Sequence, residues 1–203
     1  MLALQGDFRE HLETLEFMGE NCCLVKDINS LNQIDALIIP GGESTTLSKL
    51  SKAFDLFEPI RNRIQSGLPT YGSCAGMIML ADEILEPASG QESFGGIPML
   101  VRRNAFGSQV ESFEQDLDIA GLTYFGNDKS ASTKYRGVFI RAPWVEKVAP
   151  EVEIMASVEK TGVSHPVMVR YKNLLATSFH PEITADSRIH GFFVDELVKK
   201  ARV

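Results

Sequence analysis

The sequence predicts an α/β protein: a single-domain three-layer sandwich over residues 1–203, with a mostly parallel central sheet and an antiparallel extension. Three observations predict this class. The first half of the chain alternates apolar strand-like runs with amphipathic helical segments, which is typical of a parallel sheet covered by helices on both faces. The second half consists mainly of strand-like runs with few helices between them. The length of 203 residues suits one domain with a substantial core, and no internal repeat or obvious linker divides it.

Strands and helices alternate from the first residues onward. A strand over Leu2–Gln5 leads into a helix over Phe8–Met18, whose apolar residues recur at helical spacing and which Gly19 closes. A second strand covers Cys22–Val25. The unbroken apolar run from Asp35 to Pro40 is typical of a strand that is buried on both faces.

Later elements complete this prediction. One helix opens at the turn Gly41–Thr46 and another covers Phe57–Gln65. Six strands are then expected, at Gly96–Arg103, Gln109–Phe113, Gly137–Arg141, Glu153–Ser157, Val167–Tyr171 and Leu174–Phe179. The polar run Tyr124–Tyr135 is interpreted as a surface loop, and a last helix is expected to begin near Ala185.

The most informative segment is Tyr71–Gly76, in which Cys74 stands between two glycines. A short apolar strand precedes it, and Met77–Leu85 is predicted to be a helix. Gly-x-Cys-x-Gly at a strand-to-helix turn is the cysteine form of the nucleophile elbow. Its glycines permit strained backbone angles and a close approach of strand and helix. A helix that begins at Ala75 directs its free N–H groups and positive dipole end at the sulfur, which favours the reactive thiolate.

The alternative for Cys74 is a buried structural cysteine near a tight turn. With 16 glycines and 3 cysteines, chance places Gly-x-Cys-x-Gly about 0.02 times in a chain of this composition. The nucleophile is therefore the favoured interpretation. Cys22 and Cys23 are most simply core residues of the second strand. Three cysteines do not make a disulfide framework, which suits a reducing, cytoplasmic location.

A histidine and a glutamate follow the apolar strand that begins at Leu174. His180, within reach of a cysteine, can act as a base toward the thiol and as an acid toward the leaving group. Glu182 could then hold the imidazole in one tautomer. A histidine at an ordinary strand end is the alternative. Sites in parallel sheets form beyond the carboxyl ends of the strands, so Gly41–Ser44, Cys74 and His180 are expected to meet at one edge.

The other three histidines are expected to contribute less than His180. His11 and His190 lie on amphipathic helices and are expected at the surface or partly buried. His165 precedes Pro166 at the start of a strand and is interpreted as structural.

The segment Pro40–Thr46 is rich in glycine and opens a helix, so a phosphate-binding loop must be considered. It lacks the Gly-x-x-x-x-Gly-Lys-Ser/Thr spacing, and no lysine follows within the turn. A better use is to donate a backbone N–H to a developing oxyanion, with Ala75 as the second donor. A plain strand–helix turn explains the segment equally well.

Charge and hydropathy exclude several classes of partner. The net charge is −7 without any basic run, which argues against nucleic acid and anionic membranes. No apolar stretch reaches the length of a membrane span.

Three motifs together resemble the class I glutamine amidotransferases, the Cys-His-Glu glutaminases. They are Pro-Gly-Gly-Glu-Ser-Thr from Pro40, Gly-Ser-Cys-Ala-Gly from Gly72 and Ser-Phe-His-Pro-Glu from Ser178. Further segments at Leu4–His11, Arg103–Gly107 and Phe139–Pro143 are similar to the glutaminase subunits of pyridoxal 5′-phosphate synthases. The resemblance covers nearly the whole chain and implies a flavodoxin-like fold.

This resemblance implies hydrolysis of L-glutamine to L-glutamate and ammonia, with a thioester intermediate on Cys74. It implies a catalytic triad of Cys74, His180 and Glu182, and an oxyanion site formed by the N–H groups of Gly42 and Ala75. The residues implied for binding the amino-acid end of glutamine are Gly42, Glu43, Ser44, Arg103, Ile140 and Arg141. An arginine fork suits a carboxylate, and Glu43 suits an ammonium group.

The implied partner is a separate synthase subunit, which would use the ammonia to make pyridoxal 5′-phosphate. The chain itself has no sign of a pyridoxal phosphate site, so no cofactor and no metal are expected. Three alternatives remain at this point: a class I glutaminase of another pathway, a stand-alone cysteine hydrolase such as a γ-glutamyl peptidase, and a regulatory subunit with a silent site.

Overall fold

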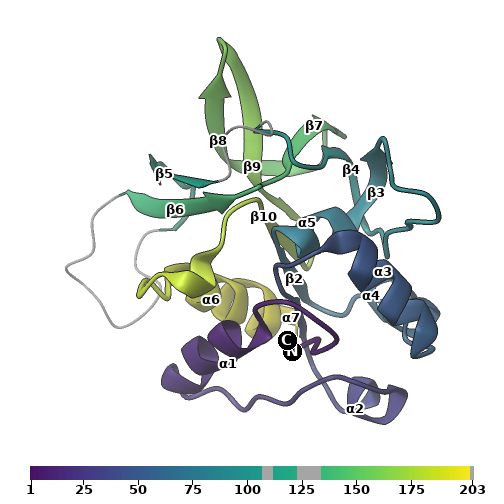
Figure 1. Cartoon of the computed structure of the whole chain (residues 1–203). Helices are drawn as coiled ribbons and strands as arrows, with labels where there is room; N and C mark the ends of the chain where they lie inside the picture. Colours follow the sequence, from purple (N-terminus) through teal and green to yellow (C-terminus); the bar gives the residue numbers. More distant parts are fainter. Residues whose placement is uncertain (107–111, 123–133, 202–203) are drawn as a thin grey trace.

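The computed structural model describes residues 1–106, 112–122 and 134–201. Its central sheet has five strands, in the order β1 (Leu37–Ile39), β2 (Thr70–Ser73), β10 (Leu174–Thr177), β9 (Val163–Tyr171) and β8 (Glu153–Lys160) (Figure 1). The first three run parallel, and β9 and β8 continue the sheet in antiparallel pairing. This arrangement confirms the predicted α/β class with its antiparallel extension.

The N-terminal segments extend the sheet beyond β1 by single contacts rather than by full strands. Leu2 pairs with Val25 in a parallel bridge, and the Leu2 N–H donates to the Ile38 carbonyl oxygen over 2.9 Å. The predicted strands at both segments are thus reduced to these bridges. Cys22 is half-buried and Cys23 is exposed, so the expectation that both belong to the core is wrong. Only Val25 of this segment is buried against the sheet.

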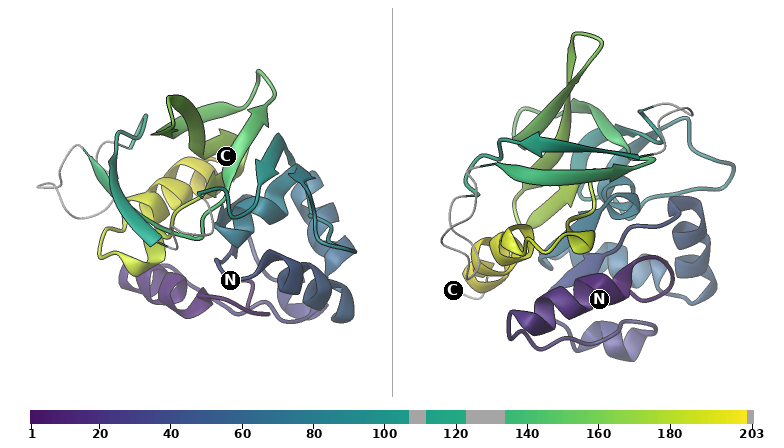
Figure 2. Two further views of the ribbon diagram at one scale, coloured as in Figure 1. Left: turned by 45° about the horizontal axis from the view of Figure 1, so that its top comes forward. Right: turned by 60° about the vertical axis from the view of Figure 1, so that its left-hand side comes forward.

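Helices cover both faces of the sheet, as the three-layer prediction requires (Figures 1 and 2). On one face lie α3 (Ser44–Ala53), α4 (Phe57–Gln65) and α5 (Ala75–Leu80), and on the other lie α1 (Phe8–Phe17) and α6 (Arg188–Phe192). Side chains of a strand alternate between faces. Leu37 and Ile39 accordingly pack into the core below α3 to α5, whereas Ile38 packs into the core below α1 and α6.

The rest of the second half forms two small sheets beside the main one. One contains β3 (Ala81–Leu85), β4 (Ile97–Arg102) and β7 (Trp144–Val148), and the other is the antiparallel pair β5 (Ser112–Leu117) and β6 (Tyr135–Ile140). Figure 2 shows the β8–β9 hairpin projecting beyond the body of the molecule. No helix in the described part of the chain is long and apolar enough to cross a membrane.

The predicted helix over Met77–Leu85 is wrong in its second half. Helix α5 ends at Leu80, and the next five residues form β3, which pairs with β4. The Asp82 carboxylate accepts a hydrogen bond of 2.7 Å from the Gly96 N–H, which fixes the two strands together. Pairing with the next strand overrides the helical propensity of this segment.

Other differences concern short elements. Helix α2 (Ile28–Asn32) was not predicted, although Asp27 and Ser30 form a capping box at its start. The last helix begins at Arg188 and continues as a π-helix over Phe193–Val198 and as α7 (Lys199–Ala201). The predicted strand Gln109–Phe113 is described only from residue 112, where β5 begins, and most of the predicted loop Tyr124–Tyr135 lies outside the described residues.

Candidate active site

The carboxyl ends of β1, β2 and β10 bring three distant segments together. The Cys74 N–H donates to the Thr177 carbonyl oxygen over 2.8 Å, which ties the elbow to the end of β10. A Cβ atom placed on Gly41 would lie only 2.5 Å from His180 Cε1. The imidazole therefore packs directly on the glycine turn that follows β1. The sequence-based expectation that these segments meet at one edge agrees with this arrangement.

The elbow at Cys74 shows which residue is strained and which residues must be small. Cys74 itself has φ 47° and ψ −100°, a conformation that non-glycine residues rarely adopt. A Cβ on Gly72 would lie 2.4 Å from the Gly76 carbonyl carbon, and one on Gly76 would lie 2.2 Å from the Ile39 carbonyl oxygen. The glycines are thus needed for close approach, whereas the left-handed conformation belongs to the cysteine.

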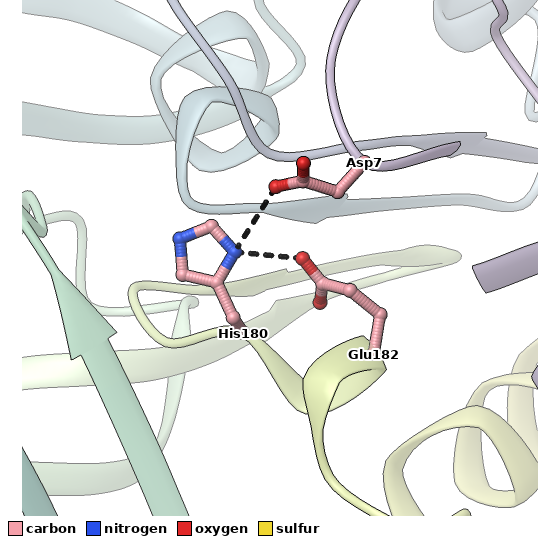
Figure 3. A group of neighbouring side chains, drawn as sticks. All are labelled: Asp7, His180 and Glu182. Atoms are coloured by element: carbon pink, nitrogen blue, oxygen red, sulfur yellow. Dashed lines mark hydrogen bonds and ion pairs between the residues drawn. The ribbon is translucent and has the colours of Figure 1, made fainter. Parts of the chain in front are cut away.

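His180 and Glu182 form a buried imidazole–carboxylate pair (Figure 3). His180 Nδ1 lies 2.7 Å from Glu182 Oε1, on the short 3₁₀ turn Pro181–Ile183 that follows β10. The Asp7 carboxylate is a second neighbour, with Oδ2 at 3.8 Å from the same nitrogen. Burial alone would lower the pKa of His180, but its hydrogen bonds to Cys74 and Glu182 and their negative charges raise the pKa to about 10.

These contacts give the site the parts of a nucleophile activated by a base. The hydrogen bond of Glu182 holds Nδ1 of His180, which leaves Nε2 as the ring nitrogen available to Cys74. Cys74 Sγ also lies 4.0 Å from the Ile140 carbonyl oxygen at the end of β6. The backbone N–H of His180 donates to the Val138 carbonyl oxygen over 2.9 Å, so β6 closes one side of the site.

The glycine turn after β1 leads into the first turn of α3. The Glu43 carboxylate caps this helix by accepting hydrogen bonds from the N–H groups of Thr45 and Thr46, at 3.0 and 2.6 Å. Burial tends to raise the pKa of Glu43, but these hydrogen bonds outweigh burial and lower it. Gly42 has φ 133°, and a Cβ there would lie 2.6 Å from Oε1 of Gln5, which accepts a hydrogen bond from the Glu43 N–H.

The residues implied for binding glutamine lie around this turn in part. Arg103 Nη2 donates to Glu43 Oε1 over 3.2 Å, so these two are in contact. Ser44 is buried at the start of α3, and Ala75 is the first residue of α5, directly after Cys74. Ile140 is the last residue of β6, and Arg141, the residue after it, has φ 42°.

Sequence reasoning missed Gln91, which joins two of these residues. Its Oε1 accepts from Arg103 Nη1 over 2.7 Å, and its Nε2 donates to Ser44 Oγ over 2.9 Å. Gln91 is buried although it lies on the loop between β3 and β4. A lone glutamine in a polar loop gives no sequence signal of such a role. Asp7 was missed as well, although its place two residues after Gln5 put it near the predicted sheet edge.

Comparison with known proteins places this architecture among the glutamine amidotransferases. A crystal structure of a glutamine amidotransferase is 43% identical, with a TM-score of 0.85 over 98% of this chain and 97% of the other. A glutamine amidotransferase of Thermotoga maritima has the same fold, with a TM-score of 0.61 at 16% identity. More narrowly, the chain belongs to the SNO glutamine amidotransferase family, whose model matches residues 1–199.

Curated relatives within this family are similar over almost their whole length. The pyridoxal 5′-phosphate synthase subunit PdxT of Streptomyces avermitilis is 55% identical over 96% of this chain and 91% of the relative. The subunit of the same name from Acidothermus cellulolyticus is 50% identical over 100% of this chain and 95% of the relative. The family resemblance expected from the sequence motifs is therefore confirmed.

Proposed function

We propose that this chain, as a single domain over residues 1–203, is the glutaminase subunit of a pyridoxal 5′-phosphate synthase. It hydrolyses L-glutamine to L-glutamate and ammonia. The observation that carries the proposal is the strained Cys74 at the start of a helix, in contact with the imidazole of His180. The buried carboxylate of Glu182 holds Nδ1 of that imidazole. Membership of the SNO family and the names of the curated relatives support the same reaction.

The first half of the reaction forms a thioester. The Cys74 thiolate attacks the side-chain amide carbon of glutamine, and the N–H groups of Gly42 and Ala75 stabilise the oxyanion. His180, charged because its pKa is raised, gives its Nε2 proton to the departing ammonia. Glu182 stabilises the imidazolium and keeps the ring oriented.

The second half releases glutamate. Neutral His180 takes a proton from water, the hydroxide attacks the γ-glutamyl thioester, and the thiolate leaves. The amino-acid end of glutamine is held by Gly42, Glu43, Ser44, Arg103, Ile140 and Arg141. A guanidinium of Arg103 or Arg141 suits the carboxylate, and Glu43 suits the ammonium group.

Ammonia passes to a synthase subunit, which is the partner we propose for this chain. The net charge of −7 favours a protein partner over nucleic acid. Three free cysteines support a cytoplasmic location, where thiols stay reduced. No cofactor or metal enters the proposed reaction.

The decisive experiment measures glutamate and ammonia formation by the purified chain, alone and with a pyridoxal 5′-phosphate synthase synthase subunit. We expect slow turnover alone, faster turnover with the partner, and formation of pyridoxal 5′-phosphate from sugar phosphates only in the complex. Cleavage of γ-glutamyl peptides without any partner would instead indicate a stand-alone hydrolase. No turnover in either assay would indicate a regulatory subunit.

The nucleophile is tested by labelling with an electrophilic glutamine analogue. We expect the label on Cys74 and loss of both labelling and turnover in Cys74→Ser. Cys23 is exposed and Cys22 lines a cavity of about 380 Å³, so both are accessible competitors for the reagent. Cys74 is only 7% exposed, so preferential labelling of Cys74 requires an activated thiolate rather than mere accessibility. Labelling confined to Cys22 and Cys23 would refute the assignment.

A further inference from the structure

Two histidines lie buried directly behind the Cys-His-Glu group. His11 on α1 and His190 on α6 are both 0% exposed, so the expectation that they lie at the surface or partly buried is wrong. Figures 1 and 2 show why: the two helices lie side by side and cover the same face of the sheet. Each histidine contacts the other, His11 also contacts Ser73 at the end of β2, and both rings lie against Tyr71 of β2.

The two rings connect to the carboxylate of Glu182 through a line of short contacts. His190 Nε2 lies 2.9 Å from His11 Nδ1, on the side away from the site. His11 Nε2 lies 2.9 Å from Ser73 Oγ and 3.3 Å from Glu182 Oε2. Among the described residues, Glu182 Oε2 has no hydrogen-bond partner, and His11 Nε2 at 3.3 Å is the polar atom that approaches it. His11 thus contacts the oxygen of Glu182 that His180 does not use.

The hydrogen-bond partners of His11 and His190 favour one pair of tautomers for the two rings. If His11 carried its proton on Nδ1, His190 would carry its proton on Nδ1 as well, where no described residue accepts it. The buried carboxylate of Glu182 would then face a bare ring nitrogen. If both rings carry the proton on Nε2, His190 donates to His11, and His11 donates toward Ser73 Oγ and Glu182 Oε2. Only His190 Nδ1, a bare acceptor, is then unpaired. This costs less free energy than the other pair of tautomers, which buries an unpaired N–H on His190 and leaves the Glu182 carboxylate without a donor on this side.

Both rings stay uncharged in this environment. Burial, followed by the charges of His190 and His180, lowers the pKa of His11 well below its usual value, and burial lowers the pKa of His190 to about 4. The N-terminal amino group adds to this lowering for His11. Two further ionisable neighbours of the pair are Tyr71, whose ring packs edge-on against both imidazoles, and Glu182. Burial raises the pKa of Tyr71 well above its usual value, so it is neutral too. A neutral His11 can donate to Glu182 without competing with His180 for the negative charge.

We propose that His11, oriented by His190, is a positioning residue that holds the second oxygen of Glu182 and thereby fixes the first oxygen on His180 Nδ1. The proposal deepens the glutaminase function and rests on it. A carboxylate held at one oxygen only can rotate about its terminal torsion, which is a broad and soft one. Rotation would release the His180 ring, so the turnover step, which needs an oriented imidazolium, suffers more than the binding of glutamine.

The test compares three substitutions at one position, in the complex with the synthase subunit. His11→Leu removes both ring nitrogens, His11→Gln keeps an amide N–H near the place of Nε2, and His11→Asn keeps one near the place of Nδ1. We expect kcat to fall about 10-fold to 100-fold in His11→Leu, the scale of a lost hydrogen bond to a charged group, with KM unchanged. His11→Gln should recover most of the loss, and His11→Asn should not.

A second measurement does not depend on turnover. The proton on His180 Nδ1, bonded to a carboxylate at 2.7 Å, should give a low-field proton NMR signal that shifts upfield or broadens in His11→Asn and stays in place in His11→Gln. Equal kcat values for the Gln and Asn variants, or an unchanged signal in all variants, would overturn the proposal. If His11→Leu does not fold, the Gln and Asn pair still decides. Failure of the wild-type complex to hydrolyse glutamine would refute the proposed function instead. The NMR comparison needs no turnover, so it would still test the contact between His11 and Glu182.

Discussion

Replacing Gly76 by alanine tests whether the elbow depends on close approach of strand and helix. Gly76 lies in α5, two residues after Cys74, and its φ is not left-handed. Helix propensity alone would make Gly76→Ala stabilising by about 1 kcal/mol. The structure predicts the opposite sign, because the new Cβ would lie 2.2 Å from the Ile39 carbonyl oxygen, whereas ordinary contact begins at 3.4 Å.

The size of the effect follows from this overlap. Strand β1 and helix α5 must separate by about 1.2 Å, and the atom in the way is backbone, which cannot rotate aside. Overpacking of this kind costs about 1–3 kcal/mol, so with the propensity gain the variant should lose up to about 2 kcal/mol of unfolding free energy. For a chain of this length each kcal/mol shifts Tm by about 2–4 °C. Because a displacement near 1 Å can cost about 100-fold in rate, kcat should fall on that scale.

Thermal unfolding followed by circular dichroism and glutamine hydrolysis in the complex measure the two effects. Gly162→Ala is the matched control, since Gly162 lies in the β8–β9 turn with φ 76° and no atom within 4 Å of an added Cβ. It should lower Tm through backbone strain alone and leave kcat unchanged. A Gly76→Ala protein with wild-type Tm and wild-type kcat would refute the close-approach argument.

Three further outcomes are expected. His180→Asn should lower kcat nearly as much as loss of the nucleophile, and Glu182→Gln should lower it less, since the orienting acid is often the least costly member; equal losses would contradict this order. The pKa of His180 is raised to about 10 in the folded protein. The stabilising contribution of His180 is therefore full below its pKa in the unfolded chain, near 6.5, and is lost as pH rises toward 10. The free energy of unfolding should fall across this range, and less steeply in Cys74→Ala. Denaturant titrations at several pH values measure this dependence. Gln91→Leu should raise KM for glutamine with little change in kcat, because it releases Arg103 from its 2.7 Å hydrogen bond; an unchanged KM would exclude that support.

The sequence predicted those parts of the fold that local patterns specify. Helix α4 begins and ends as expected at Phe57 and Gln65, because its apolar spacing is regular and Gly67 follows. The elbow was recognisable because Gly72 and Gly76 flank one cysteine. Strand β3 was not, since Ala81–Leu85 continues a helical pattern and becomes a strand only by pairing with β4 across the intervening loop.

Burial of polar side chains was the other property that local patterns did not reveal. His11 occupies a helix position that looks amphipathic, and nothing in α1 indicates that α6 covers it. Gln91 is likewise buried by partners on α3 and at Arg103. Such positions are specified by the packing of distant elements, which a single sequence does not display. The roles of the glutamine-binding residues stay predictions.

The Glu43 carboxylate makes two sets of contacts, and a substitution at this position removes both of them. It closes the first turn of α3 through Thr45 and Thr46, and it also contacts Arg103. An ammonium group that binds to Glu43 therefore meets a charge already shared among helix N–H groups and a guanidinium. A helix cap is worth about 1 kcal/mol, so a variant that lacks this carboxylate loosens the turn carrying Gly42 before any substrate arrives. In the proposed site, recognition of the substrate and the shape of the oxyanion site therefore both depend on the Glu43 side chain.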